Sequence, residues 1–336
     1  MVEGPWSTKR LSGPSAIDHR PLTISAMIAT VTLNPALDKS IYIDRLHPND
    51  ANRILRVEVD AGGKGINASR VLKELGSETI ALGFVGGKIG SFIEHALKGE
   101  GIPTDFVHVN SDTRTNVCIQ EMTGSPPTML NEPGPTISEA DFDQLFDKVR
   151  EVAKKSSFVI FGGSLPPGVP KDIYQLFVKV VQDSDSKAIL DSEGEPMRMG
   201  MKSIPYMIKP NREEAERLVN LRVKNVGEAV RAANILLGIG VKVVVISMGA
   251  DGAVAGSANE MWQAVPPKVT PVSTIGSGDS MVAGIAHILD KGGSLGEALK
   301  WGTAAGAATA MTDGTEICKH RQVQELVGKV RLERLS

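Results

Sequence analysis

The sequence predicts an α/β fold: a doubly wound, mainly parallel sheet covered by helices on both faces, with a small antiparallel β-sheet lid. Short runs rich in Ile and Val, apolar on both faces, alternate with amphipathic helical stretches. This is the pattern of a covered parallel sheet. Two other segments alternate apolar and polar residues, which is typical of strands with one solvated face. With no repeat and no low-complexity linker, the pattern indicates one large domain over residues 27–336.

The alternating pattern starts at Met27, after a segment of different composition. Residues 1–26 contain Pro, Gly and Ser but lack the apolar core of a signal peptide. We expect them to be a disordered tail, a tag or a misassigned start; a cleaved targeting sequence has little support. The predicted strands are IATVTL (28–33), TIALGFV (79–85), FVIFGG (158–163), KAILD (187–191), PYMIK (205–209) and VKVVVIS (241–247). The predicted helices cover residues 66–76, 141–155 and 227–240.

The two segments with period-two patterning are about 39–60 and 104–132. In the first, Ile41 and Ile43 share one face, and Val57 and Val59 share another. We expect both segments to form a lid over one edge of the α/β layer, because a site that must close needs a movable cover. An exposed lid sheet of this kind could also pair two chains as a homodimer.

Composition excludes some classes of protein. The chain has 336 residues, of which 41% are hydrophobic and 23% charged, with a net charge of −2. A near-neutral charge argues against nucleic-acid or anionic-membrane partners, and no apolar run reaches the roughly 18 to 20 residues of a spanning helix. Cys118 and Cys318 fit no metal or redox spacing, so a reducing cytoplasm is the simplest location.

The first glycine cluster is AGGKGIN (61–67), directly before a predicted helix. Glycines let the backbone approach a ligand closely, and a helix N-terminus offers unpaired N–H groups. It is not a Walker loop, and the near match GFVGGKIG (83–90) has Ile89 where Ser or Thr would bind magnesium. The structural alternative is a tight turn with a solvated Lys64.

Two more clusters follow predicted strands. GGSLPPG (162–168) lies at a strand's carboxyl end, where open α/β sheets bind ligands, although it could also be a simple β-to-α connection. In IKPNREEAE (208–216), Asn211 and Glu214 match a helix-start signature. The functional alternative is that Asn211 and Glu214 face a cleft and hold a hydrated metal ion.

The last two clusters complete the set. ISMGADGA (246–253) follows the strongest strand; Asp251-Gly252 reads as a hairpin turn that could also line a nucleotide. In STIGSGDSM (273–281), Asp279 would suffice as a helix cap without the glycines before it. Gly276, Ser277 and Gly278 instead predict converging N–H groups at a helix N-terminus, which stabilise a transferring phosphoryl group. Asp279 beside them could accept the proton of an attacking hydroxyl.

Together with TLNPALDKS near the start, these motifs occur in the order and approximate spacing of the ribokinase-like sugar kinases. From about Met27 to the C-terminus the chain resembles the phosphofructokinase B branch, which includes 1-phosphofructokinase and tagatose-6-phosphate kinase. The resemblance implies ATP and Mg²⁺ as cofactors, Asp279 as catalytic base and residues 276–278 as the anion hole. It implies that Asn211 and Glu214 act on magnesium and the phosphates, and that Lys209, Ser247, Gly249 and Gly252 lie at the nucleotide. It assigns Asp38, Gly63 and Asn67 to the sugar.

This branch accepts a sugar that already carries a phosphate. Arg53 and Arg114, in the two lid segments, suit that phosphate because arginine offers two parallel donors; the alternative is that both are solvated. Lys64 and Ser164 are further candidates for this sugar site. NEPGP (131–135) is similar to the same stretch in many 1-phosphofructokinases, and this resemblance favours fructose 1-phosphate as substrate and fructose 1,6-bisphosphate as product. Tagatose 6-phosphate and fructose 6-phosphate remain rivals, and a sensor that binds without turnover is the alternative of another class.

Overall fold

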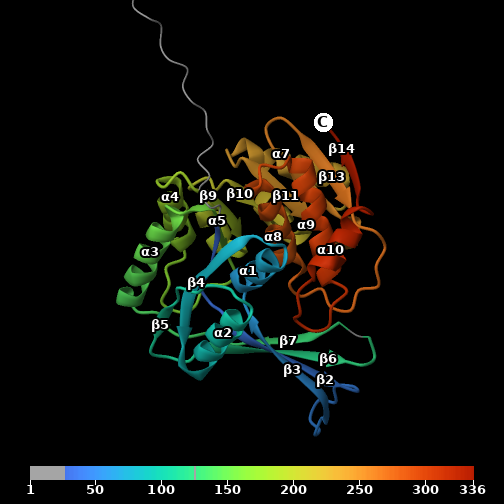
Figure 1. Ribbon diagram of the computed structural model, residues 1–336. Helices are drawn as coiled ribbons and strands as arrows, with labels where there is room; N and C mark the ends of the chain where they lie inside the picture. The colour runs from blue at the N-terminus through green and yellow to red at the C-terminus, as the bar shows by residue number, and fades with distance from the viewer. Residues whose placement is uncertain (1–26, 125) are drawn as a thin grey trace, which may run out of the picture.

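The computed structural model describes residues 27–124 and 126–336; the predictions for residues 1–26 lie outside this part. Its main feature is a ten-stranded sheet flanked by helices, with a four-stranded sheet at one end (Figure 1). The strand order in the large sheet is β14-β13-β12-β11-β10-β9-β8-β1-β4-β5. Its strands are β1 (Met27–Thr32), β4 (Glu78–Gly86), β5 (Val107–Val109), β8 (Ser156–Gly162), β9 (Lys187–Asp191), β10 (Met207–Ile208), β11 (Val243–Ser247), β12 (Ala253–Gly256), β13 (Met261–Val265) and β14 (Arg331–Arg334).

Seven adjacent strands, from β5 to β11, run parallel, and β12, β13 and β14 extend the sheet in antiparallel pairings. The predicted doubly wound, mainly parallel sheet is therefore confirmed. The six predicted strands are all present, although PYMIK contributes only Met207 and Ile208 to the ladder. The turn at Asp251-Gly252 joins β11 to β12 as predicted, through the short 3-10 turn Gly249–Asp251.

Helices cover both faces of the large sheet. One face carries α1 (Lys64–Glu74), α8 (Ser277–Asp290), α9 (Leu295–Thr309) and α10 (His320–Val327). The other carries α3 (Glu139–Ala153), α4 (Ile173–Gln182), α5 (Gly194–Met201), α6 (Arg212–Val219) and α7 (Val226–Gly238). The remaining helix, α2 (Gly87–Gly99), packs against β4 near the lid. Each layer buries its own apolar core, so the ends of the strands are left to carry polar groups.

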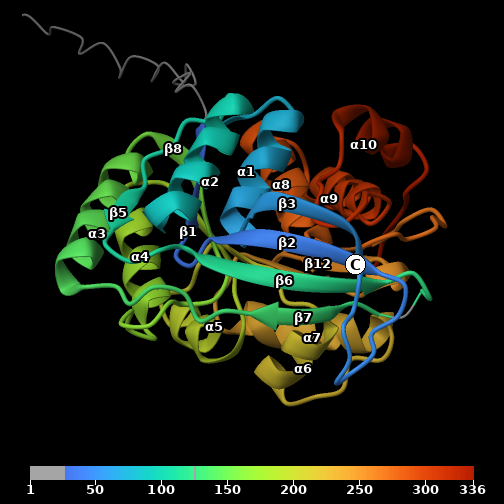
Figure 2. The same ribbon diagram turned by 90° about the horizontal axis from the view of Figure 1, so that it is seen from below.

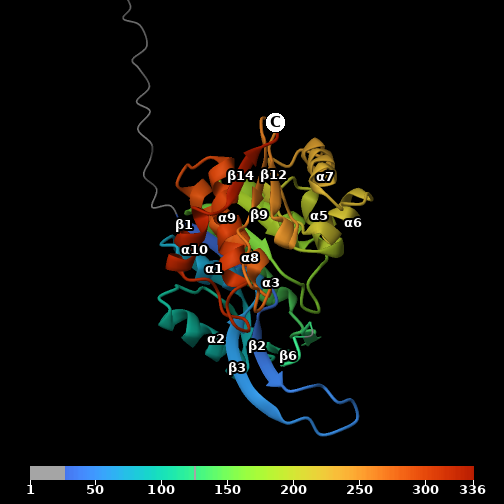
Figure 3. The same ribbon diagram turned by 90° about the vertical axis from the view of Figure 1, so that its right-hand side faces the viewer.

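The small sheet, called the lid below, has the order β3-β2-β6-β7 (Figure 2). Its strands are β2 (Ala36–Ile43), β3 (Ile54–Gly62), β6 (Arg114–Glu121) and β7 (Thr128–Asn131). Pairing within each lid segment is antiparallel, as predicted, but β2 and β6 meet in parallel, so the sheet is mixed. Ile41 pairs directly with Val57, so the prediction that these residues lie on different faces is wrong. The β2–β3 hairpin extends beyond the body of the molecule (Figure 3).

The second lid segment is shorter than predicted. Residues 107–109 form β5, which pairs with β4 in the large sheet instead of joining the lid. Val107 and Val109 are buried while His108 is exposed. A half-covered edge strand has the same period-two pattern as a lid strand, so the pattern alone does not separate them.

Candidate active site

Asp279 lies in the first turn of α8 and is 7% exposed. Asn67 on α1 donates a hydrogen bond of 2.9 Å from its side-chain amide to Asp279 Oδ2. Burial raises the pKa of Asp279 to about 6; Asp191 also raises it, while Lys64, Asn67 and Lys209 lower it. Desolvation therefore outweighs the helix dipole, although the carboxylate is still mostly ionised at pH 7.

The loop before Asp279 has the shape that its glycines predict. Gly276 is the N-cap of α8 with a φ of 75°, a conformation that glycine adopts at little cost. The side-chain hydroxyl of Ser277 is buried without a hydrogen-bond partner. A Cβ on Gly278 would lie 3.3 Å from Lys209 Nζ, so the buried ammonium group of Lys209 stands directly beside this loop.

Asp191, which the sequence reasoning missed, lies between two lysines. It ends β9 and is 2% exposed. Its Oδ1 is 3.1 Å from Lys64 Nζ and 3.4 Å from Lys209 Nζ, while its Oδ2 has no partner. Burial opposes its charge, but Lys209 and Lys64 outweigh that effect and lower its pKa. The signal that could have found it was an isolated acid at the carboxyl end of a predicted strand.

Lys64, a candidate for the sugar site in the sequence analysis, pairs with Asp191 in this cluster. Burial alone would discharge it, but Asp191, Asp279 and Glu214 together raise its pKa. Two lysines, Lys209 buried and Lys64 partly exposed, thus lie among three carboxyl groups. The two ammonium groups keep Asp191 ionised and supply the local positive charge that an anionic ligand would contact.

Asn211 and Glu214 form a capping box at the start of α6, as the helix-start signature predicts. Asn211 Oδ1 accepts from the Glu214 backbone N–H at 2.9 Å, and Glu214 Oε2 accepts from the Asn211 backbone N–H at 2.8 Å. Burial raises the pKa of Glu214, whereas its hydrogen bond from Asn211 lowers it. The second carboxylate oxygen of Glu214 is not used by the cap, so capping and ligand binding are compatible here.

The β11–β12 turn adjoins this helix start. The Ser247 backbone N–H donates to the Pro210 carbonyl at 3.1 Å, and Ser247 forms an isolated parallel β-bridge with Asn211. Gly249 opens the turn with a φ of 61°. Gly252 faces the backbone of β13 so closely that no side chain would fit, which gives it a packing role.

Asp38 on β2 extends from the lid toward the cleft. Its Oδ1 accepts a hydrogen bond of 2.9 Å from Asn116 on β6, its cross-strand neighbour. Burial raises its pKa, and the bond from Asn116 lowers it. A side chain on Gly62 would overlap Asp38, and a Cβ on Gly63, which has a φ of 126°, would lie 2.7 Å from Thr32. The glycines of AGGKGIN are therefore required by packing as well as by any ligand.

Arg114, the first residue of β6, ties the lid to the loops that follow β1 and β7. Its guanidinium donates to the carbonyls of Glu132 and Asn34, both at 3.0 Å, while its buried Nε has no partner. Asn34 in turn donates to the Pro133 carbonyl at 3.0 Å and to Ser164 at 3.4 Å. The motifs TLNPALD, NEPGP and GGSLPPG are thereby joined at one point.

Within one chain, Arg53 does not reach the point where these three motifs meet. It is exposed in the loop before β3, next to the Ile43–Ile54 pair, whereas Asp38 pairs with Asp60 near the other end of the hairpin. The sequence analysis treated residues 44–53 as part of a continuous strand pattern, but they form the loop of a long hairpin.

The lid is tied to the loop that precedes the anion hole. Thr315 Oγ1 donates to Asp60 Oδ2 on β3 at 2.6 Å, and Arg56 Nη1 lies 3.7 Å from Asp313 Oδ2. Between those residues, the Gly314 carbonyl accepts from Ser273 Oγ at 2.7 Å. Ser273 lies three residues before Gly276. A change in lid position therefore has a short covalent and hydrogen-bonded route to the anion hole.

Several of the candidate site residues have buried polar atoms without a hydrogen-bond partner. Five of the nine buried side-chain polar atoms that lack a partner in the described chain belong to residues named above, namely Asn34, Arg114, Asn116, Asp191 and Ser277. Buried polar groups in folded proteins are nearly always hydrogen-bonded. Their concentration here indicates a site that completes its hydrogen bonds with a polar ligand.

Comparisons with known proteins agree with this geometry. Residues 31–322 match the pfkB family of carbohydrate kinases. The chain is 38% identical over 308 residues to the 1-phosphofructokinase of Borreliella burgdorferi, covering 91% of this chain and 98% of that protein. It is 33% identical to the tagatose-6-phosphate kinase of Staphylococcus epidermidis, covering 86% and 94% respectively.

A solved structure is similar over the same length. Phosphofructokinase-2 from Escherichia coli, crystallised in complex with substrates and products, superimposes with a TM-score of 0.86. It is 30% identical and is matched over 99% of its chain and 90% of this one. The fold, the order of the motifs and the residues around Asp279 agree with these comparisons. The chain belongs to the pfkB family of carbohydrate kinases and is a sugar-phosphate kinase.

Proposed function

We propose that the enzyme transfers the γ-phosphoryl group of ATP to fructose 1-phosphate and forms fructose 1,6-bisphosphate. The observation that carries this proposal is the arrangement around Asp279: a buried carboxylate fixed by Asn67, next to a glycine loop, the buried Lys209 and the partly exposed Lys64. The relatives named 1-phosphofructokinase in Borreliella burgdorferi and Bacillus subtilis, 38% and 34% identical, support the choice of sugar.

In this reaction Asp279 accepts the proton of the sugar hydroxyl, whose oxygen forms a bond to the γ-phosphorus as the bond to the β-phosphate oxygen of ATP breaks. ADP leaves with that oxygen. With a pKa of about 6, Asp279 is roughly nine-tenths ionised at pH 7 and still basic enough to take a proton efficiently. Backbone N–H groups of residues 276–278 and the ammonium groups of Lys209 and Lys64 offset the charge on the transferring group.

The residues present fit a nucleotide-bound magnesium ion. Asp191 Oδ2 is buried and unpartnered, and the second oxygen of Glu214 is not used by its cap, so both could accept hydrogen bonds from metal-bound water. Within the described residues no group of three or more His, Cys, Asp or Glu side chains is placed to hold a metal. When bound with the nucleotide, the ion would supply positive charge that offsets the charge of the phosphates.

The sugar would lie between the lid and the glycine loop of α1. Asp38, held by Asn116, suits the sugar hydroxyls, and Asn67 lies between this region and Asp279. Arg114, whose Nε is buried without a partner, is the lid cation placed to receive the substrate's existing phosphate. Ser164, close to Asn34, is the candidate for a neutral hydrogen bond to that phosphate.

We also propose that two chains pair through the outer face of the lid. By the strand register, this face carries Ile41, Val57, Val59, Val117 and Leu130. Val57, Val59 and Leu130 are 43%, 41% and 55% exposed, an apolar surface that association would cover. The similar phosphofructokinase-2 of Escherichia coli has been crystallised in a tetrameric inhibited form, which supports assembly in this family. Within residues 27–124 and 126–336, no helix is both long enough and apolar enough to cross a membrane.

The test is a coupled ADP-production assay on the purified protein with fructose 1-phosphate, fructose 6-phosphate, tagatose 6-phosphate and fructose. We expect a kcat/KM at least about tenfold higher for fructose 1-phosphate than for the others, the scale of one well-placed charged contact. Preference for either 6-phosphate would overturn the choice of substrate. Binding of phosphosugars with no ADP formed would favour a sensor, and activity on fructose alone would exclude a phosphate-binding role for Arg114.

A further inference from the structure

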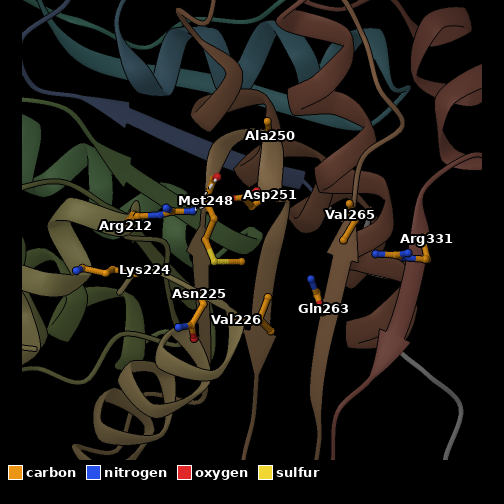
Figure 4. A pocket seen from close by; sticks show the side chains of 10 residues that line it. All are labelled: Arg212, Lys224, Asn225, Val226, Met248, Ala250, Asp251, Gln263, Val265 and Arg331. Carbon is orange, nitrogen blue, oxygen red and sulfur yellow. Dashed lines mark hydrogen bonds and ion pairs between the residues drawn. The ribbon is translucent and has the colours of Figure 1, made fainter. Parts of the chain in front are cut away.

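A cavity of about 330 Å³ lies beside the catalytic cleft, on the α7 side of the sheet (Figure 4). Its walls come from the starts of α6 and α7, the β11–β12 turn, β13 and β14. Neither Asp279 nor Asp191, Lys64 or Lys209 lines it. The proposed reaction therefore gives this cavity no role.

The charge of the cavity is positive. Its lining includes the cations Arg212, Lys224 and Arg331 but only one acid, Asp251. Arg212 Nη2 is 2.7 Å from Asp251 Oδ2, so these two charges offset each other. In the described part of the chain, the side chain of Arg331 has neither an ion-pair nor a hydrogen-bond partner. An anion entering the cavity would thus meet charge that no acid of the protein has neutralised.

The shape of the lining narrows the class of ligand. Figure 4 shows the guanidinium groups of Arg212 and Arg331 extending toward the cavity from opposite walls. Between them lie the apolar side chains of Met248, Val226 and Val265 and the amide of Gln263. A guanidinium group at each end, that of Arg331 unpaired and that of Arg212 shared with Asp251, and the apolar surface between them suit a small organic molecule with two anionic groups on a short carbon chain better than a bare ion.

The cavity shares its walls with the nucleotide side of the cleft. Met248, Ala250 and Asp251 line it, and they alternate along the chain with Ser247, Gly249 and Gly252, the residues predicted to face ATP. The turn is held together by a 2.8 Å bond from the Met248 N–H to the Gly252 carbonyl. Arg212 follows Asn211 directly. A ligand that shifts the residues on one side of this turn would therefore also shift the residues on its other side.

We propose that this cavity is a regulatory site for a small phosphorylated carboxylate, and that binding there changes the affinity for ATP through the β11–β12 turn. The binding claim stands independently of the proposed reaction; the effect on ATP rests on it. Lys224 adds to the local potential without pointing between the two arginines (Figure 4).

The test is isothermal titration calorimetry of the full chain with 3-phosphoglycerate as probe, in the presence of a saturating non-hydrolysable ATP analogue that fills the catalytic cleft. We expect one site in the wild type and a loss of affinity of about tenfold or more in Arg331→Ala, the scale of one charge-assisted contact. Arg334→Ala removes a cation from the same strand, outside the cavity lining, and should bind as the wild type does.

Three outcomes would overturn the site: no binding once the cleft is filled, equal affinity in Arg331→Ala, or equal losses in both variants. If binding is confirmed, the KM for ATP should change with 3-phosphoglycerate in the wild type and not in Arg331→Ala. An unchanged KM would overturn the regulatory role alone. Because calorimetry needs no turnover, failure of the site and failure of the proposed reaction are separate results.

Discussion

The side-chain amide of Asn67 donates a 2.9 Å hydrogen bond to Asp279 across 212 positions of sequence, and so joins the glycine loop of α1 to the first turn of α8. One motif carries candidate sugar contacts and the other the candidate base. The bond fixes the orientation of the carboxylate without neutralising it. Five predictions follow from the surroundings of this pair.

Replacing the carboxylate should separate activity from stability. We expect Asp279→Asn to lower kcat by about 10²-fold or more, because an amide cannot accept the hydroxyl proton. The folded-state pKa of Asp279 is raised, so its contribution to stability is present below the unfolded-state pKa and lost as the pH rises through about 6. At pH 7 the ionised form therefore costs stability, and the variant should unfold at a higher temperature. Near-normal turnover, or a lower unfolding temperature at pH 7, would contradict this account.

The pH dependence of kcat should depend on Lys64. Protonation of Asp279 predicts an acid limb near pH 6 in the wild type. Lys64 lowers the pKa of Asp279, so Lys64→Met should move that limb to higher pH and reduce kcat more at pH 6 than at pH 8. Lys64→Arg, which keeps the charge, should leave the limb closer to the wild-type position. An acid limb that is the same in all three proteins would remove Lys64 from the electrostatics of Asp279.

Arg114 should matter for the substrate's phosphate. We expect Arg114→Ala to raise the KM for fructose 1-phosphate by about tenfold or more, while leaving the weaker KM for unphosphorylated fructose nearly unchanged. Arg114 also bonds the carbonyls of Asn34 and Glu132, so loss of those bonds alone would weaken both sugars equally. Comparing the two sugars in one variant therefore distinguishes phosphate binding from lid structure, and equal losses would favour lid structure.

The bond between Thr315 and Asp60 should couple the lid to the anion hole. Thr315→Val leaves the Asp60 carboxylate without this donor, and we expect kcat to fall by about tenfold, the scale of a hydrogen bond to a charged group. Hydrogen exchange in β3 should rise, since the lid would open more often. Thr315→Ser retains the hydroxyl and should restore both values. If Thr315→Ser is as impaired as Thr315→Val, packing and not the hydrogen bond is responsible.

The outer face of the lid should control assembly. Val57→Asp places a charge on its exposed apolar surface, and we expect light scattering to show monomers where the wild type forms dimers. Leu221→Asp, at an exposed apolar residue beyond the end of α6, is a matched control that should stay dimeric. A wild type that is monomeric at all concentrations would contradict the proposed pairing.

Much of this architecture could be predicted from the sequence because it depends on local patterns. Period and composition located the six apolar strands and placed GGSLPPG, IKPNREEAE and ISMGADGA at the ends of three of them. Asp191 was missed because its partners, Lys64 and Lys209, are 127 and 18 residues away in the sequence, and only the fold brings them together. The raised pKa of Asp279 has a related cause: the helix dipole can be read from the sequence, but burial of the carboxylate cannot.

The same limit explains the errors at the lid. Arg53 occupies a stretch of alternating residues, but hairpin length is set by pairing between β2 and β3, which placed it in the loop. Residues 107–109 have lid-like alternation and yet complete the edge of the large sheet. Edge strands and lid strands share one pattern, and the contacts made by the covered face decide between them.

The most direct test of the central claim is phosphorus NMR of the purified protein with ATP, magnesium and fructose 1-phosphate, beside an identical sample of Asp279→Ala. The account predicts that a new phosphomonoester resonance on C6 of the sugar grows in equal amount with ADP, and that the variant is slower by about 10²-fold or more. ADP that appears with inorganic phosphate alone, or a product that forms equally fast in Asp279→Ala, would contradict it.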